Sequence, residues 1–195
     1  MTGTQDGQVG RIPSGRLRQL GPVNWVFAKL AARSVGAPEM HLFTTLGQRQ
    51  ALFWAWSIYG GRLLRGRLPR IDTELVILRV AHLRSSEYEL QHHRRMARQE
   101  GLDANMQATI FAWPEAPDGD GPRTILSARQ QALLRATDEL VNDRSISDGT
   151  WRQLATHLDR RRLIEFCLLT TQYDGLAATI SALDIPLDNP RTSHT

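Results

Sequence analysis

Apolar side chains recur every three or four positions along most of the chain, the spacing that places them on one face of an α-helix. The segments with this pattern are 24–35, 38–64, 71–83, 87–102, 127–143, 147–158 and 161–183. No segment alternates apolar and polar residues between turn signals, as a half-buried strand would. The pattern therefore predicts an all-α protein, with the very apolar segment 161–183 as its central buried helix.

Glycine and proline indicate where the predicted helices are interrupted. Gly60-Gly61 lies inside the segment 38–64 and predicts a break there, because glycine is unfavourable in a helix interior. Residues 113–126 are rich in proline and glycine and are expected to form an internal loop. Residues 1–22 are rich in glycine, arginine and polar residues, which predicts an N-terminal arm that is partly mobile. Residues 23–190 are expected to form a single helical domain, since 195 residues suffice for one core.

The composition is that of an ordinary globular protein, with 41% hydrophobic and 23% charged residues. No apolar run approaches the roughly 20 residues that cross a bilayer, and the first residues lack the apolar core of a secretory signal. We therefore expect a cytoplasmic protein with no membrane partner.

The positive charge of the chain comes almost entirely from arginine. The formal net charge is +4, and Lys29 is the only lysine. The arginines are dispersed, and no basic run is interleaved with the aromatic residues on which bases stack. We expect these arginines to hold carboxylates or subunit interfaces, and we expect no nucleic-acid partner.

The stretch SSEYELQHH, residues 85–93, gathers several groups that can transfer protons. On a helix, Glu89 and His93 are four residues apart and project from the same face. A carboxylate there can orient an imidazole and raise its basicity. A break at Arg84-Ser85 would let two helices pack antiparallel and bring Glu74 to face His93. Glu74, Ser86, Glu89 and His93 would then form a hydrogen-bonded relay.

Other interpretations of the same residues need no chemistry. Ser86 and Glu89 have the spacing of a capping box, and Glu74 in a first helical turn interacts favourably with the helix dipole. His92 and His93 stand beside arginines and could belong to a solvated face. These two imidazoles diverge by about 100° on a helix, so the pair is not a metal motif, and we expect no metal site.

Residues 64–103 resemble the core of the carboxymuconolactone decarboxylase family, which shares its all-helical fold with alkyl hydroperoxidase D. The family pattern is a glutamate, twelve residues later a cysteine or small residue, three later a cysteine or glutamate, and four later a histidine. Glu74, Ser86, Glu89 and His93 occupy these positions. Residues 136–188 are also similar to the tail of longer family members. The resemblance implies a single-domain alkyl hydroperoxidase D-like helical bundle.

The peroxidase branch of this family has two cysteines where this chain has Ser86 and Glu89, so thiol chemistry has no nucleophile at these positions. The decarboxylase branch uses no cofactor and keeps the glutamate and histidine that Glu89 and His93 match. The resemblance therefore implies a cofactor-free acid/base enzyme that decarboxylates or isomerises a small acidic, lactone-like or enolisable substrate. His93 would be the proton donor or base, Glu89 its orienter, and Glu74 a second acid/base group.

Three further residues are candidates for binding the substrate. Ser86 belongs to the relay, and an arginine should hold the substrate carboxylate, with Arg79 as the candidate and Arg84 as its neighbour. Tyr59, with two nearby tryptophans, could line an apolar pocket, although aromatic residues at helical spacing serve more often in a core or an interface.

The resembled family forms trimers and hexamers, so we expect a homo-oligomer. One alternative function is a non-catalytic oligomeric binding protein on the same scaffold. Another is a hydroperoxide reductase that depends on Cys167, the single cysteine. The second alternative is disfavoured because burial in an apolar helix should raise the pKa of the Cys167 thiol and suppress the reactive thiolate.

Overall fold

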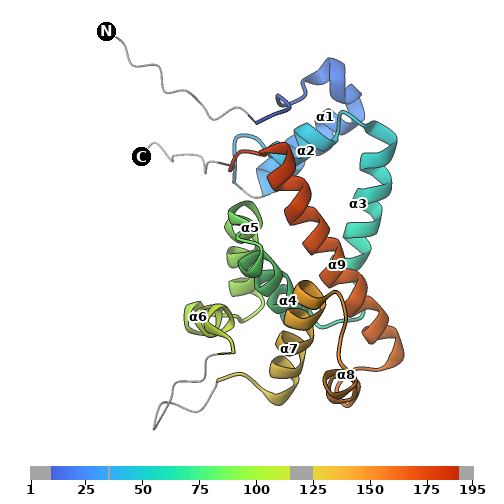
Figure 1. Ribbon diagram of the computed structural model, residues 1–195. Coiled ribbons are helices and arrows are strands. Elements are labelled where there is room, and N and C mark those ends of the chain that lie inside the picture. Colours follow the sequence, from blue (N-terminus) through green and yellow to red (C-terminus); the bar gives the residue numbers. More distant parts are fainter. Residues whose placement is uncertain (1–9, 35, 115–124, 189–195) are drawn as a thin grey trace. The chain divides into compact units, whose positions relative to one another are not determined.

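The computed structural model describes residues 10–34, 36–114 and 125–188 (Figure 1). Within these ranges every regular element is a helix, and no strand occurs. The helices are α1 Leu17–Ser34, α2 His41–Leu46, α3 Gln50–Leu64, α4 Arg70–Leu83, α5 Glu87–Gln99, α6 Ala104–Ala112, α7 Ala128–Asp143, α8 Asp148–Ala155 and α9 Arg160–Leu183. The predicted all-α fold is confirmed. None of these helices is both long enough and apolar enough to cross a membrane.

The chain divides into two compact units. The first unit comprises Met1–Tyr59 and Thr179–Thr195, and the second comprises Gly60–Ala178. In the first unit α1 begins at Leu17, inside the predicted arm of residues 1–22, and residues 1–9 lie outside the described ranges. The expected single domain over 23–190 stays a prediction.

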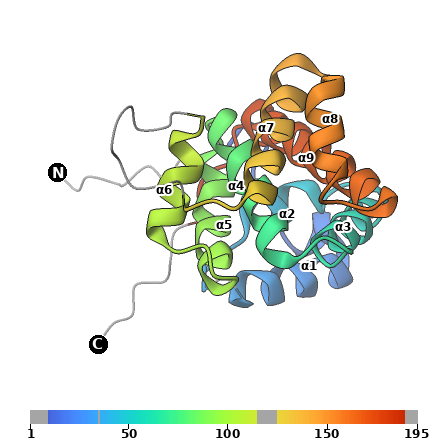
Figure 2. The same ribbon diagram turned by 90° about the horizontal axis from the view of Figure 1, so that it is seen from below.

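The core of the second unit is built around α4. Between residues 75 and 81 of this helix, six apolar side chains have no exposed surface: Leu75, Val76, Ile77, Leu78, Val80 and Ala81. They lie on all sides of the helix, and α4 accordingly packs against α5, α6 and α7 (Figure 1, Figure 2). A helix that is apolar all round is a buried helix.

The prediction that 161–183 is the central buried helix is therefore wrong. In the second unit, α9 packs one face on the core through Phe166, Leu169 and Tyr173. Its opposite face exposes Ile164 and Leu168, at 57% and 42% of their surface. The sequence of α9 is apolar on both faces, but only one face packs on this core.

The turn between α4 and α5 forms where the sequence predicts it. Ser85 adopts a left-handed conformation with φ of 50°. The backbone N–H of Ser86 then donates to the carbonyl of Ala81 at 2.8 Å, which closes the end of α4. The two helices pack against each other as a hairpin.

The first unit contains α1, α2 and most of α3. Its aromatic side chains form one cluster of stacked and edge-on rings: Phe27, Phe43, Phe53, Trp54 and Trp56. The two tryptophans therefore serve in packing, the alternative that the sequence left open for them.

The break predicted at Gly60-Gly61 is absent, because α3 runs through both glycines. The interruption of 38–64 lies instead after α2, at Gly47. A Cβ atom at Gly47 would lie 2.6 Å from the carbonyl oxygen of Phe43, so the turn there requires glycine. A glycine inside a helix costs only about 1 kcal/mol relative to alanine, which surrounding packing can offset.

We expect Gly61→Ala to raise the free energy of unfolding by about 0.5–1 kcal/mol, because alanine lowers the entropy of the unfolded chain. The added methyl group would meet open space. Chemical denaturation measures the change. Gly101→Ala is the control and should destabilise, since Gly101 has φ of 98°. A loss of stability in Gly61→Ala would contradict a continuous α3.

Candidate functional site

A buried carboxylate and an imidazole meet across the hairpin of α4 and α5. Glu74 on α4 has no exposed surface, and His93 on α5 is also buried. Glu74 Oε2 lies 2.8 Å from His93 Nδ1. A carboxylate oxygen accepts, so Nδ1 donates and carries the ring hydrogen in this arrangement. The other ring nitrogen, Nε2, is left as the proton acceptor of the neutral imidazole.

The second oxygen of Glu74 faces an arginine. Arg70, one turn earlier on α4, places its guanidinium 3.8 Å from Glu74 Oε1. The same guanidinium lies 3.4 Å from Glu100 and donates to the carbonyl of Leu64. Burying a carboxylate is costly unless opposite charge and hydrogen bonds accompany it. For Glu74, Arg70 supplies the opposite charge and His93 supplies the hydrogen bond.

Glu89 lies on α5 in the same buried region but in a different electrostatic state. It is 3% exposed, and neither carboxylate oxygen has a hydrogen-bond partner among the described residues. Burial raises the pKa of Glu89 to about 7; the nearby Ser86 hydroxyl opposes this shift, and the charge of Asp174 adds to it. The Ser86 hydroxyl does not reach hydrogen-bond geometry with Glu89. At neutral pH Glu89 therefore carries a proton for much of the time.

The structure assigns the orienting contact differently from the sequence. The sequence indicated that Glu89 would orient His93, but it is Glu74 that accepts the hydrogen bond of the ring. The capping box also fails to form, because the Ser86 side chain makes no capping hydrogen bond to α5. Residues four apart on one helix lie side by side, whereas Glu74 approaches the ring from the facing helix.

Tyr173 on α9 completes the cluster and was missed from the sequence. Its ring meets the His93 ring edge-on, with centroids 5.2 Å apart and planes at 86°. Burial, followed by the charges of Glu74 and Glu89, raises the pKa of Tyr173 well above its usual value. Its phenol therefore stays protonated at neutral pH. It lies eighty residues from His93, so no local spacing signals the contact.

Arg79 is occupied by structural contacts. Its guanidinium donates to both oxygens of Asp138, at 2.6 and 2.9 Å. It also donates to the carbonyls of Ile110 and Phe111. Arg79 is only 4% exposed, and these bonds tie α4 to α6 and α7. Four of its five N–H donors are engaged in these bonds, which makes Arg79 a structural arginine in this arrangement, and its predicted role in holding a substrate carboxylate stays a prediction.

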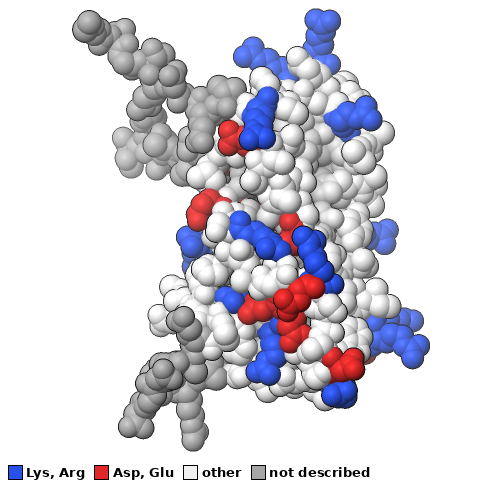
Figure 3. All heavy atoms as spheres, in the orientation of Figure 1, with Lys and Arg blue, Asp and Glu red and all other residues white. Residues whose placement is uncertain are grey.

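The remaining candidates have different environments. Arg84 pairs with Asp174 at 2.5 Å, and on the face seen in Figure 3 most acidic side chains lie beside basic ones. Tyr59 belongs to the first unit and is 38% exposed, so its role stays a prediction. Cys167 is partly buried, and burial raises the pKa of its thiol. In the described ranges no three His, Cys, Asp or Glu side chains are grouped as metal ligands.

Comparison with known proteins relates the segment that carries these residues to a family. Residues 50–138 match the sequence profile of the carboxymuconolactone decarboxylase family, a range that contains Glu74, Glu89 and His93. This segment of the chain belongs to the carboxymuconolactone decarboxylase family. Because it has one cysteine, it lacks the paired cysteines of a CxxC motif. No match is found among curated proteins.

Solved structures show that the fold of the alkylhydroperoxidase AhpD core is shared over nearly the whole chain. An uncharacterised peroxidase-related protein from Silicibacter has a TM-score of 0.76 at 14% identity, covering 95% of each chain. An alkylhydroperoxidase AhpD core protein from Ralstonia eutropha has a TM-score of 0.75 at 15% identity, covering 94% of each chain. A cysteine-to-alanine variant of the debrominase Bmp8, in complex with 2,3,4-tribromopyrrole, has a TM-score of 0.71 at 12% identity and covers 96% of this chain and 95% of its own.

We expect Glu89→Gln to reduce the pH dependence of the free energy of unfolding. The pKa of Glu89 is about 7 in the folded protein, against an ordinary 4.5. The folded chain therefore keeps a proton that the unfolded chain releases in this interval. The resulting stabilisation is complete below the unfolded pKa and is lost as pH rises through the folded pKa. Over that interval the wild type should lose up to about 3 kcal/mol relative to the variant.

Urea unfolding of both proteins, from below pH 4.5 to above pH 7, measures this difference. Glu87→Gln is the matched control, since Glu87 is an exposed glutamate on the same helix and should keep the wild-type profile. Parallel pH profiles for the wild type and Glu89→Gln would contradict the raised pKa.

Proposed function

We propose that this protein is a cofactor-free acid/base enzyme that decarboxylates or isomerises a small acidic, lactone-like or enolisable substrate. The observation that supports the proposal is the buried hydrogen bond between Glu74 and His93, with the raised pKa of Glu89 nearby. Proton transfer at neutral pH needs a base of fixed orientation and an acid that still holds its proton. Two carboxyl groups in different environments can divide these tasks.

In this proposal each residue has a defined task. His93 Nε2 accepts or delivers the proton at the reacting carbon, and Glu74 holds the ring tautomer and stabilises the imidazolium that forms. Protonated Glu89 donates a hydrogen bond to the oxygen on which enolate charge develops. In a decarboxylation, the C–C bond electrons stay on the substrate as an enolate when CO2 leaves. This direction starts from the imidazolium form of His93: the enolate carbon takes the Nε2 proton, the ring returns to the neutral imidazole, and a proton from solvent restores the imidazolium.

The family name supports this reading without fixing the substrate, because one fold hosts many activities. A non-catalytic binding protein on the same scaffold is the alternative. A hydroperoxide reductase is less well supported, although two similar structures are described as peroxidase-related. The raised pKa of the Cys167 thiol disfavours its reactive thiolate form. A cytoplasmic location remains our prediction.

We also propose that the enzyme works as a homo-oligomer, a trimer or a hexamer. Several large apolar side chains of the first unit are exposed, among them Leu30 on α1 and Leu52 and Ile58 on α3. Exposed apolar side chains of this size on two helices of one unit are typical of surfaces that other subunits cover.

We expect Glu74→Gln and His93→Gln each to lower turnover by about 100-fold or more, because each removes one half of an acid/base pair. The double variant should be scarcely slower than either single variant, since groups that act as a unit are not additive. A panel of lactone acids and β-keto acids, followed by CO2 release and ultraviolet absorbance, provides the assay.

Glu87→Gln, the exposed glutamate on α5, is the control and should keep wild-type turnover. Two results would count against the enzyme. One is the absence of turnover above His93→Gln on every substrate, which favours the binding protein. The other is a double variant whose loss is the product of the single losses, because Glu74 and His93 would then act independently.

A further inference from the structure

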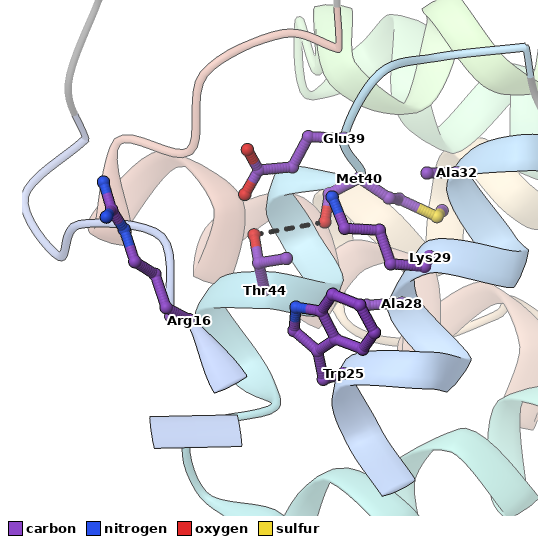
Figure 4. Close-up of a pocket in the computed structure, with 9 residues that line it drawn as sticks. Arg16, Trp25, Ala28, Lys29, Ala32, Glu39, Met40 and Thr44 are labelled. Carbon is purple, nitrogen blue, oxygen red and sulfur yellow. Dashed lines mark hydrogen bonds between the residues drawn. The ribbon is translucent and has the colours of Figure 1, made fainter. Parts of the chain in front are cut away.

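The first unit contains a cavity of about 200 Å³ beside α1 (Figure 4). One wall is a single face of this helix, on which Trp25, Ala28, Lys29 and Ala32 follow one another at helical spacing. The cavity shares no residue with the cluster around Glu74 and His93. None of its residues has a part in the proposed reaction.

Small side chains on α1 create the space. Ala28 and Ala32 are both buried and form an apolar floor. Trp25 and Lys29, one turn apart on the same helix, lie next to each other, with the Lys29 amine 5.9 Å from the centroid of the Trp25 ring. The indole thus offers a flat apolar surface directly beside a positive charge.

The segment that carries Arg16 is held against α2 by close backbone packing. The N–H of Gly15 donates to the carbonyl of Thr44 at 2.9 Å. A Cβ atom at Gly15 would lie 2.8 Å from that carbonyl oxygen and 2.7 Å from Gln48, so the approach requires glycine. Gln48 also donates to the carbonyl of Pro13. This rim of the cavity is therefore fixed in place.

The opposite rim is fixed by a buried acid. Asp188 accepts from the backbone N–H of His41 at 2.8 Å and lies 2.7 Å from its Nδ1. The contact between Asp188 and His41 Nδ1 raises the pKa of His41, against the opposing effect of burial. His41 directly follows Glu39 and Met40, which line the cavity. Both rims are thus held by specific contacts.

The charges at the opening are unequal. Lys29 points toward the gap between α1 and the segment of Glu39 and Met40, and Arg16 lies beyond Thr44 (Figure 4). No hydrogen bond joins Lys29 or Arg16 to Glu39, the acidic residue of the lining. Two cations and one carboxylate leave an excess of one positive charge beside an apolar floor.

We propose that this cavity binds a small organic monocarboxylate with a flat, apolar body. The ligand carboxylate pairs with Lys29 within the positive field of Arg16, and the body stacks on Trp25 over the two alanines. The volume holds about seven water-sized groups, which suits a single ring rather than a larger ligand. Glu39 disfavours a second negative charge, so dicarboxylates should bind less well.

Benzoate is the probe for this proposal, added to the full chain and followed by the indole N–H signals in ¹H–¹⁵N NMR. The Trp25 signal is assigned with Trp25→Phe. We expect benzoate to shift this signal with a dissociation constant on the order of 1 mM. Benzamide, which lacks the charge, and terephthalate, which has two charges, should each bind at least about tenfold more weakly.

Two variants test the contacts, and one serves as a control. Lys29→Gln should weaken benzoate binding about tenfold, as expected for the loss of a charged hydrogen-bond partner. Ala28→Leu should abolish it by filling the floor. Arg33→Gln removes one charge from an exposed position of the same helix and should bind normally. The readout needs no turnover, so it is independent of the proposed reaction.

The proposal is overturned by any of three results. The first is no shift of the Trp25 signal at benzoate concentrations up to about 20 mM. The second is equal weakening in Lys29→Gln and Arg33→Gln, which would indicate attraction to the general positive charge. The third is binding of benzamide as tight as that of benzoate, which would assign the cavity to neutral apolar ligands.

Discussion

The hydrogen bond between Glu74 and His93 is the constraint on which the rest of the site depends. A carboxylate with no exposed surface is stable only with partners at fixed positions. The imidazole comes from the facing helix, so α4 and α5 must pack antiparallel in one register. The left-handed turn at Ser85 sets that register. Arg70 then balances the remaining oxygen from the solvent side, at 3.8 Å.

The two glutamates of the site differ because only one has partners. Glu74 lies between an arginine and an imidazole, whereas neither oxygen of Glu89 makes a hydrogen bond in the described structure. Burial without a partner raises the pKa of Glu89 to about 7. Asp174 strengthens this effect, and Arg84 and Arg144 hold Asp174 in place. One site thereby contains an oriented base and an acid that keeps its proton near neutral pH.

The sequence predicted the helices and the members of the site better than their contacts. Periodicity located seven helical segments, and the break at Arg84-Ser85 brought Glu74 to His93 as expected. The periodicity of apolar residues did not reveal α6, although Asp103 caps that helix by accepting from the N–H of Met106. Partners distant in sequence were beyond local patterns: Tyr173 reaches His93 from α9, and Asp138 occupies Arg79 from α7. Glu89 was assigned the orienting contact because spacing along one helix is visible in a sequence, whereas a contact between two helices is not.

The position of the hydrogen on the His93 ring tests the central claim most directly. Long-range ¹H–¹⁵N NMR distinguishes the two neutral tautomers of a histidine. If Glu74 accepts from Nδ1, the wild type and Glu89→Gln should both carry the hydrogen on Nδ1. Glu74→Leu, which removes the acceptor from a buried position, should lose this preference. A hydrogen on Nε2 in the wild type, or one that moves in Glu89→Gln but not in Glu74→Leu, would contradict the account.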